Sequence, residues 1–287
     1  MLRFICISIG LLSCHLLYAQ TDSVRTNPLD DDVYLHPVDC ITAYTLPKGE
    51  WIYGQSLQTL PFPSWMFYGI TDKLTTQIDL LPWIGGFVTE LKKPIPSLNL
   101  RYQFVEQHGA VPSIAFEAMF IYFWDTLDRF ETVSTHVYES GAYWHFKPVM
   151  SYQFGDDWYV HTSVGADYIG ALIMETTDTV EPVTRNFTKS WNPNAAVGVD
   201  YRPSPFISYH IACNYGATLT FLENVPRKFM FTYGFRVAPF YKNRFGILRS
   251  MRIELLSING YFPDLKTYQG IPVPIYPYIY WQWQRRP

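Results

Sequence analysis

The sequence predicts an all-β fold, a transmembrane up-and-down antiparallel β-barrel of about 12 strands, on three observations. Apolar and polar residues alternate with a period of two along most of the chain, as strands with one apolar face require. Aromatic residues gather at the ends of the alternating segments. After residue 19 there is no apolar stretch of about 18 residues or more, which excludes a helical membrane protein.

The composition narrows the class of protein further. The 287 residues are 18% aromatic and 16% charged, and the net charge of −3 offers no basic surface, so we expect no nucleic-acid partner. Sequence motifs for nucleotide or zinc binding do not occur, and we expect no cofactor and no metal ion. The mature chain would keep only Cys40 and Cys213, which make no disulfide framework.

The first 19 residues are typical of a secretory signal peptide. Arg3 supplies a positive charge, an apolar stretch follows, and Ala19 is a small residue before the expected cleavage. An alternative interpretation is a lipobox at residues 11–14, which would leave a lipid on Cys14. Residues 20–47 are polar and irregular and predict a periplasmic arm or a lumen plug, and residues 48–287 predict an outer-membrane β-barrel.

The strand candidates come in pairs whose connections alternate in length. Short turns are expected at residues 69–73, 106–111, 155–157, 202–206 and 241–244, and longer loops at 84–95, 124–140, 171–190, 221–228 and 259–273. Brief turns on one side are typical of outer-membrane barrels, in which they face the periplasm. About twelve strands of roughly ten residues would each cross a bilayer at a tilt.

A soluble β-sandwich would also alternate, but two features favour the barrel. Sandwich strands average about five to six residues, and these run nearly twice that length. The aromatic residues also form two groups at the strand ends, as the girdles at two membrane interfaces would. They include Trp65, Phe67, Tyr68, Tyr102, Phe104, Tyr122, Phe123, Trp124, Trp144, Trp158, Tyr159, Trp281 and Trp283.

Two segments carry a resemblance to a known group of proteins. Residues 42–50, TAYTLPKGE, resemble the start of the first strand in uncharacterised outer-membrane β-barrel proteins of the Bacteroidota type. Residues 68–75, YGITDKLT, resemble the turn that follows in those proteins and in the barrel family associated with phenol degradation. The resemblance implies an outer-membrane location and a barrel fold, with Gly69 and Asp72 making a periplasmic turn. The chain departs from the common barrel ending, since it finishes with Arg285, Arg286 and Pro287 instead of an aromatic residue.

The alternation assigns a set of charged and histidine residues to the lumen. These predicted lumen-lining residues are Arg101, Glu117, His145, Lys147, His161, Asp167, Asp200, His210, Arg236, Arg252 and Glu254. Both signs of charge are present. One interpretation is a water-filled pore of modest selectivity. The other is a filled interior in which these residues pair with one another, because a barrel of about twelve strands is intermediate between a packed barrel and an open porin.

A catalytic site is the weaker hypothesis, and we expect no enzyme. His161, Ser163 and Glu175 match the spacing of the residues used by outer-membrane lipid A deacylases, and a serine nucleophile needs such a base and an orienting group. However, His161 and Ser163 are expected on the lumen face, whereas a lipid hydrolase meets its substrate from the bilayer. Glu175 would lie roughly 30 Å or more away along the strand.

The sequence therefore predicts a channel or porin-like passage for a small solute in the cell outer membrane. Its expected partners are membrane lipid, lipopolysaccharide and the barrel assembly machinery. The alternative is a closed barrel whose surface loops bind a partner or a polysaccharide. The acidic loop at 124–140 could bind a cation or a ligand there, although a solvated loop is the simpler interpretation.

Overall fold

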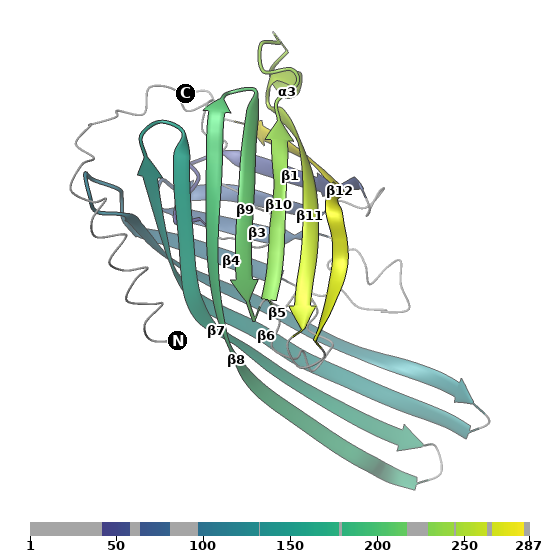
Figure 1. The fold of residues 1–287 in the computed structure, drawn as a ribbon. Helices are drawn as coiled ribbons and strands as arrows, with labels where there is room; N and C mark the ends of the chain where they lie inside the picture. The colour runs from purple at the N-terminus through teal and green to yellow at the C-terminus, as the bar shows by residue number, and fades with distance from the viewer. Residues whose placement is uncertain are drawn as a thin grey trace.

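The computed structural model of the protein describes residues 42–57, 64–80, 97–131, 133–177, 180–216, 229–243, 245–262 and 266–283. Twelve strands form one closed antiparallel barrel, in which each strand pairs with its neighbours in the chain and β1 pairs with β12 (Figure 1). The predicted all-β, up-and-down barrel is confirmed. The described part of the chain contains no helix that is long and apolar enough to cross a membrane.

The strands differ widely in length. They are β1 (Trp51–Ser56), β2 (Trp65–Thr71), β3 (Leu74–Asp79), β4 (Ser97–Val105), β5 (Ser113–Glu131), β6 (Val133–Phe154), β7 (Trp158–Thr177), β8 (Val180–Ser204), β9 (Ile207–Tyr215), β10 (Phe229–Val237), β11 (Met251–Phe262) and β12 (Thr267–Trp283). The short helix α3 (Gly246–Arg249) lies between β10 and β11.

Four strands continue far beyond the roughly ten residues that the sequence predicts. Strands β5 to β8 contain 19, 22, 20 and 25 residues and project from the barrel as a four-stranded sheet (Figure 1). The loops predicted at 124–140, 171–190 and 259–273 are wrong, because all three segments are hairpins whose pairing continues to Glu131–Val133, Thr177–Val180 and Phe262–Thr267. Their polar composition predicts loops, but pairing between the strands satisfies the backbone N–H and C=O groups of a hairpin whatever its side chains are.

Most of the predicted short connections lie together at one end of the barrel, which we call the short-turn end. Strands β2 and β3 are joined by residues 72–73, β6 and β7 by 155–157, and β8 and β9 by 205–206. Gly155 has a φ of 59° and so allows the tight β6–β7 turn. The turn predicted at 241–244 is too short, because the connection between β10 and β11 runs from 238 to 250 and contains α3.

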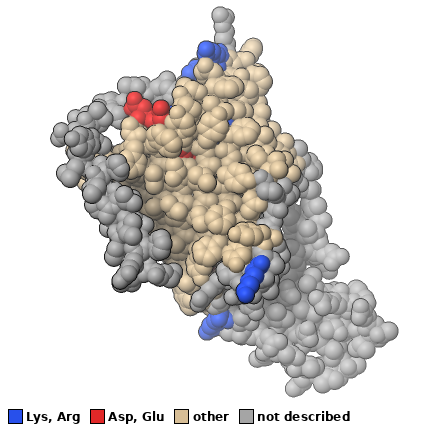
Figure 2. Space-filling model, viewed as in Figure 1, with Lys and Arg blue, Asp and Glu red and all other residues tan. Residues whose placement is uncertain are grey.

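The period-two alternation matches the two faces of the barrel wall. On β4, Leu98, Tyr102 and Phe104 are exposed, whereas Asn99 and Arg101 between them are buried. The outer face visible in Figure 2 is largely free of charged side chains in its middle, and most of the charged atoms lie towards its two ends. The barrel thus turns an apolar surface outward and encloses polar groups.

Candidate functional site

The charged residues assigned to the lumen by alternation lie on the inner face of the barrel. Ten of them are buried, and Lys147 is half-buried. Most of the buried ones meet in three groups near the short-turn end, centred on Glu117, Glu254 and His161. Asp167 is buried farther along β7, opposite His145 in the strand register. Arg252 is buried at the start of β11, where its Nη1 donates to the carbonyl oxygens of Arg249 and Met251.

The Glu117 cluster joins three neighbouring strands through one carboxylate. Arg101 on β4 donates from Nε and Nη2 to Glu117 Oε2, at 2.9 and 2.7 Å. Asn99 Nδ2 donates to Oε1 at 3.0 Å, and His145 Nε2 on β6 lies 3.1 Å from the same oxygen. Glu117 is 1% exposed, so its carboxylate has lost its hydration water, and these contacts take the place of that water.

The Glu254 cluster is built from strands β9 to β12. Arg236 Nη2 lies 3.3 Å from both Glu254 oxygens, and the Tyr280 hydroxyl donates to Oε2. His210 Nδ1 lies 3.5 Å from Oε1. The Arg236 guanidinium also stacks over the Tyr280 ring, 5.1 Å from its centroid. A carboxylate, an arginine and a histidine thus occur together in both clusters.

A third group connects β6, β7 and β8. Ser151 Oγ lies 2.7 Å from His161 Nδ1, and His161 Nε2 lies 3.4 Å from Asp200 Oδ2. Arg202 Nη2 lies 3.8 Å from the same Asp200 oxygen. A serine beside a histidine and a carboxylate is the arrangement of a nucleophile and its base. Here, however, all three of Ser151, His161 and Asp200 are buried, and another part of the chain covers the serine.

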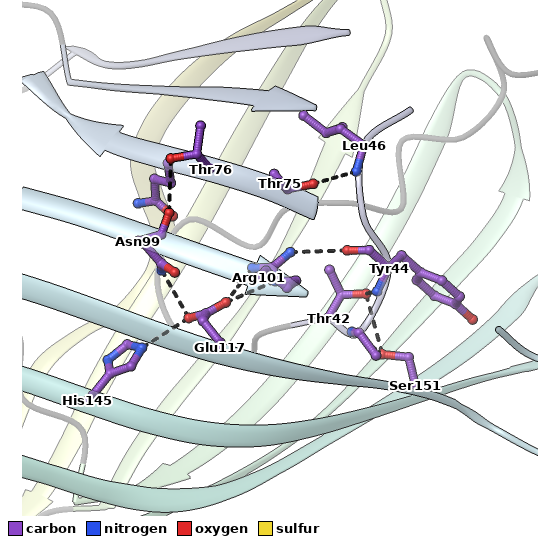
Figure 3. Close-up of polar contacts among 12 residues, drawn as sticks. Thr42, Tyr44, Leu46, Thr75, Thr76, Asn99, Arg101, Glu117, His145 and Ser151 are labelled. Carbon is purple, nitrogen blue, oxygen red and sulfur yellow. Dashed lines mark hydrogen bonds and ion pairs between the residues drawn. The ribbon is translucent and has the colours of Figure 1, made fainter. Parts of the chain in front are cut away.

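That covering segment is residues 42–48, which we call the arm. It enters the barrel at the short-turn end, where the wall binds its backbone. Ala43 N donates to Ser151 Oγ at 2.7 Å, and Leu46 N donates to Thr75 Oγ1 at 2.7 Å. The Tyr44 carbonyl accepts a hydrogen bond of 3.3 Å from Arg101 Nη1, which links the arm to the Glu117 cluster (Figure 3).

The side chains of the arm fill the interior between opposite walls. Tyr44 and Leu46 belong to one buried apolar cluster with Ile52, Phe67, Tyr159 and Tyr280, which come from β1, β2, β7 and β12. Phe67 and Tyr159 are thus inside the barrel, which corrects their predicted place in the aromatic groups at the membrane interfaces. Ala43 packs against Ala115 and Val149 on β5 and β6. Since β1 and β7 lie on opposite sides of the ring, the arm spans it. Of the two interpretations of the lumen, the described residues therefore favour a filled interior at this end.

The two segments that carry the family resemblance contact each other. Lys48 N donates to Asp72 Oδ1 at 2.9 Å, and Gly49 N donates to Gly69 O at 2.8 Å. Gly69 lies inside β2 and not in the turn, which corrects its predicted role. A Cβ on Gly69 would lie 2.0 Å from the Pro47 carbonyl oxygen, so only glycine lets the arm pass there. Residues 68–75 thus form a receptor for residues 42–50.

The residues of the weaker, catalytic hypothesis do not come together. His161 contacts Ser151 and not Ser163, which the sequence had paired with it. Glu175 lies fourteen residues farther along β7, roughly 45 Å at about 3.3 Å per residue, in the projecting part of the strand. The side chains of the predicted cation-binding segment 124–140 lie outside the described residues, as does the signal peptide.

Several residues of the site were absent from the sequence prediction. Ser151, Asn99 and Tyr280 all occupy inward positions of the alternation, but they are uncharged and so did not stand out. The arm residues Tyr44 and Leu46 lie in the motif at residues 42–50 and in the segment predicted to be an arm or a lumen plug. The strands that they contact could not be predicted, because nothing local indicates a contact with strands far away in sequence. A search for polar residues at all inward positions would have found the first three.

Fold and interior together define the class: a closed twelve-stranded antiparallel barrel with a polar interior and an internal N-terminal segment. No protein-family model matches the chain, and no curated protein is significantly similar to it. The resemblance to Bacteroidota outer-membrane barrels therefore stays a prediction.

Proposed function

We propose that the protein is a β-barrel of the cell outer membrane that passes a small solute, and that the arm closes it at rest. The observation that carries the proposal is the closed ring with large apolar side chains exposed on its outside and buried charge inside. Hydrocarbon offers backbone groups no hydrogen-bond partners, and a ring without sheet edges meets that requirement. Membrane lipid and lipopolysaccharide would then cover the apolar face, after insertion by the barrel assembly machinery.

The arm supports a resting, closed state. Its residues 42–46 are buried between opposite walls, so a solute that passed the short-turn end would have to displace them. Its contacts with Ser151, Thr75 and Asp72 are hydrogen bonds to side chains and not strand pairing, so it can leave without opening the ring. The barrel would therefore provide the passage, and the arm would close it.

Planar-bilayer conductance of the refolded full-length chain tests this proposal. The unseated variant combines Ala43→Arg and Leu46→Arg, which place two long cations where the wall accepts a methyl group and an apolar side chain. We expect a clear rise in single-channel current over the wild type. Lys48→Gln is the matched control, because the Lys48 side chain is exposed and the arm stays seated. If the unseated variant forms a stable folded barrel but carries no current, the proposed passage is wrong.

A second candidate function is binding at the surface by the projecting sheet. Strands β5 to β8, with 19, 22, 20 and 25 residues, are about twice as long as a membrane crossing requires, since about nine to eleven residues suffice. Shortening the hairpins at 124–140 and 171–189 should leave conductance intact but abolish binding to a surface polysaccharide. Unchanged binding after the deletion would reject this role.

We further propose that the protein has no catalytic activity. Ser151, His161 and Asp200 are the one group among the described residues that resembles a nucleophile with its base, and the arm backbone occupies the serine. A serine that accepts a hydrogen bond from Ala43 N and contacts His161 already has a structural role in the wall.

A further inference from the structure

The way the wall holds the arm indicates what else could bind there. Three wall groups accept hydrogen bonds from backbone N–H groups of the arm: Ser151 Oγ from Ala43, Thr75 Oγ1 from Leu46, and Asp72 Oδ1 from Lys48. One wall group, Arg101 Nη1, donates to a backbone carbonyl. These four contacts are made to the peptide backbone, so they do not depend on the side chains of the bound segment.

The side-chain positions beside these contacts are of three kinds, and one is polar: the buried Thr45 hydroxyl donates to the Asp72 carbonyl oxygen at 2.6 Å and lies 3.1 Å from Gln103 Oε1. The position of Ala43 is bounded by Ala115 and Val149 and is fully buried, so it accepts only a small side chain. The positions of Tyr44 and Leu46 lie in the apolar cluster with Phe67, Tyr159 and Ile52, and they accept an aromatic and an aliphatic side chain. The Tyr44 ring also meets the Tyr159 ring edge-on at 6.4 Å.

We propose that the inner wall at the short-turn end is a peptide-binding site, which the arm occupies in this structure and which a separate linear peptide takes when the arm leaves. The inference rests on the proposed function, since it names the class of solute that the barrel would admit. Its preferred sequence is a small residue, an aromatic residue, a residue with a hydroxyl group and an aliphatic residue, in that order, because the buried Thr45 hydroxyl donates to the Asp72 carbonyl oxygen at 2.6 Å.

The chemistry of the wall favours a peptide over other small solutes. A sugar offers hydroxyl groups and an inorganic ion offers one charge. Neither presents three N–H donors and a carbonyl along one chain, which is the pattern that the wall groups match. Glu117 neutralises Arg101, and the Asp72 carboxylate is exposed to water, so the buried wall around the arm gives no charge-based reason to select an anion or a cation.

The test measures binding of a labelled synthetic peptide with the sequence of residues 42–50 to the full-length unseated variant in detergent, by fluorescence anisotropy. Folding is checked by heat-modifiable migration in gels, and Ala43→Arg alone replaces the double variant if the latter does not fold. We expect saturable binding to the unseated variant and none to Lys48→Gln, whose own arm fills the site. A second peptide keeps only the alanine, tyrosine and leucine and has serine elsewhere, and we expect it to bind as well.

Changes in the wall test whether the backbone contacts hold the peptide. Thr75→Val in the unseated variant removes the acceptor for one N–H group, and we expect binding about fivefold weaker. Thr76→Val is the matched control on the outer face of the same strand, and it should leave binding unchanged. N-methylation of the alanine and leucine nitrogens of the peptide should abolish binding.

The outcomes separate this inference from the proposed passage. Saturable binding without any current would support the peptide site and overturn the passage. Current in the unseated variant that neither peptide binds to or blocks would support the passage and overturn the peptide site. Equal binding of a scrambled peptide, or equal binding by Thr75→Val, would also overturn it.

Discussion

The Glu117 and Glu254 clusters use the same three residue types in different ways. Glu117 receives four contacts between 2.7 and 3.1 Å, from Asn99, Arg101 and His145. Glu254 receives longer contacts of 3.3 Å from Arg236 and 3.5 Å from His210, together with the Tyr280 hydroxyl.

The two clusters also differ in how they meet the arm. Arg101 donates a hydrogen bond to the Tyr44 carbonyl, so the Glu117 cluster holds the arm through an arginine whose other nitrogens are fixed by the carboxylate. The Glu254 cluster meets the arm through the Tyr280 ring, in the apolar cluster. We infer that the Glu117 cluster both braces the wall and seats the arm, whereas the Glu254 cluster braces the wall.

Removing each carboxylate should give the largest effect and separate the two roles. Glu117→Ala leaves Arg101 buried without its counter-charge, and we expect a loss of about 3–5 kcal/mol in the free energy of unfolding. Glu254→Ala should cost less, about 2–3 kcal/mol, because Arg236 keeps its stacking on Tyr280. Guanidinium titration of tryptophan fluorescence in lipid vesicles measures both.

Single-channel conductance is the second measurement for the Glu117→Ala and Glu254→Ala variants. Glu117→Ala should raise the current, since Arg101 loses the partner that aims it at the arm, and Glu254→Ala should not. Replacing Glu117 and Arg101 together by leucine and methionine should recover much of the stability, because no charge is left unpaired. Equal effects of the two single variants on both measurements would remove the distinction between the clusters.

Arginine-to-lysine exchanges should give the next largest effect. Arg101 uses three nitrogens for two partners, Glu117 and the Tyr44 carbonyl, and a lysine ammonium cannot reach both in the same geometry. We expect Arg101→Lys to cost about 1.5–3 kcal/mol of unfolding free energy and to increase conductance. Arg236→Lys should cost about 1 kcal/mol and leave the current unchanged, because its contacts are longer. A greater cost at Arg236 would contradict the comparison.

The sequence predicted the barrel because its signal is local and repeated. On β4, Leu98, Leu100 and Tyr102 alternate with Asn99 and Arg101, and that order alone assigns the two faces of the strand. The strand extensions at 124–140 and 171–190 failed because alternation there does not separate apolar from polar residues. Their pairing is a property of the backbone, which the sequence does not display.

The arm site could not be derived in the same way. Ala43 and Ser151 are 108 residues apart in sequence, and a contact between a backbone N–H and a serine leaves no pattern in either segment. Gly69 did give a signal, as part of a recognisable motif, but its role was assigned to the turn. Its close approach to Pro47 becomes visible only when the arm is placed.

Truncation of Ser151 should have a smaller effect than the charge changes. Ser151→Ala removes the acceptor for Ala43 N and the contact with His161, and we expect a loss of about 1–2 kcal/mol with a modest rise in current. Ser163→Ala, a buried serine two residues from His161, is the matched control and should change the unfolding free energy by less than about 0.5 kcal/mol. If both variants behave alike, Ser151 does not seat the arm.

The last prediction is that the Ser151 hydroxyl is unreactive, so no effect is expected. An activated nucleophile would be labelled by a fluorophosphonate and lose the label on Ser151→Ala. In the wild type the reagent cannot reach Ser151, which is 1% exposed beneath the arm. In the unseated variant the reagent can reach it, so labelling there separates burial from lack of reactivity. We expect no labelling in either protein, because Arg202 shares the Asp200 carboxylate with His161 and so weakens the charge that would support His161 as a base. Stoichiometric labelling of the unseated variant, lost in Ser151→Ala, would make the arm the cover of an enzyme site instead of the plug of a passage.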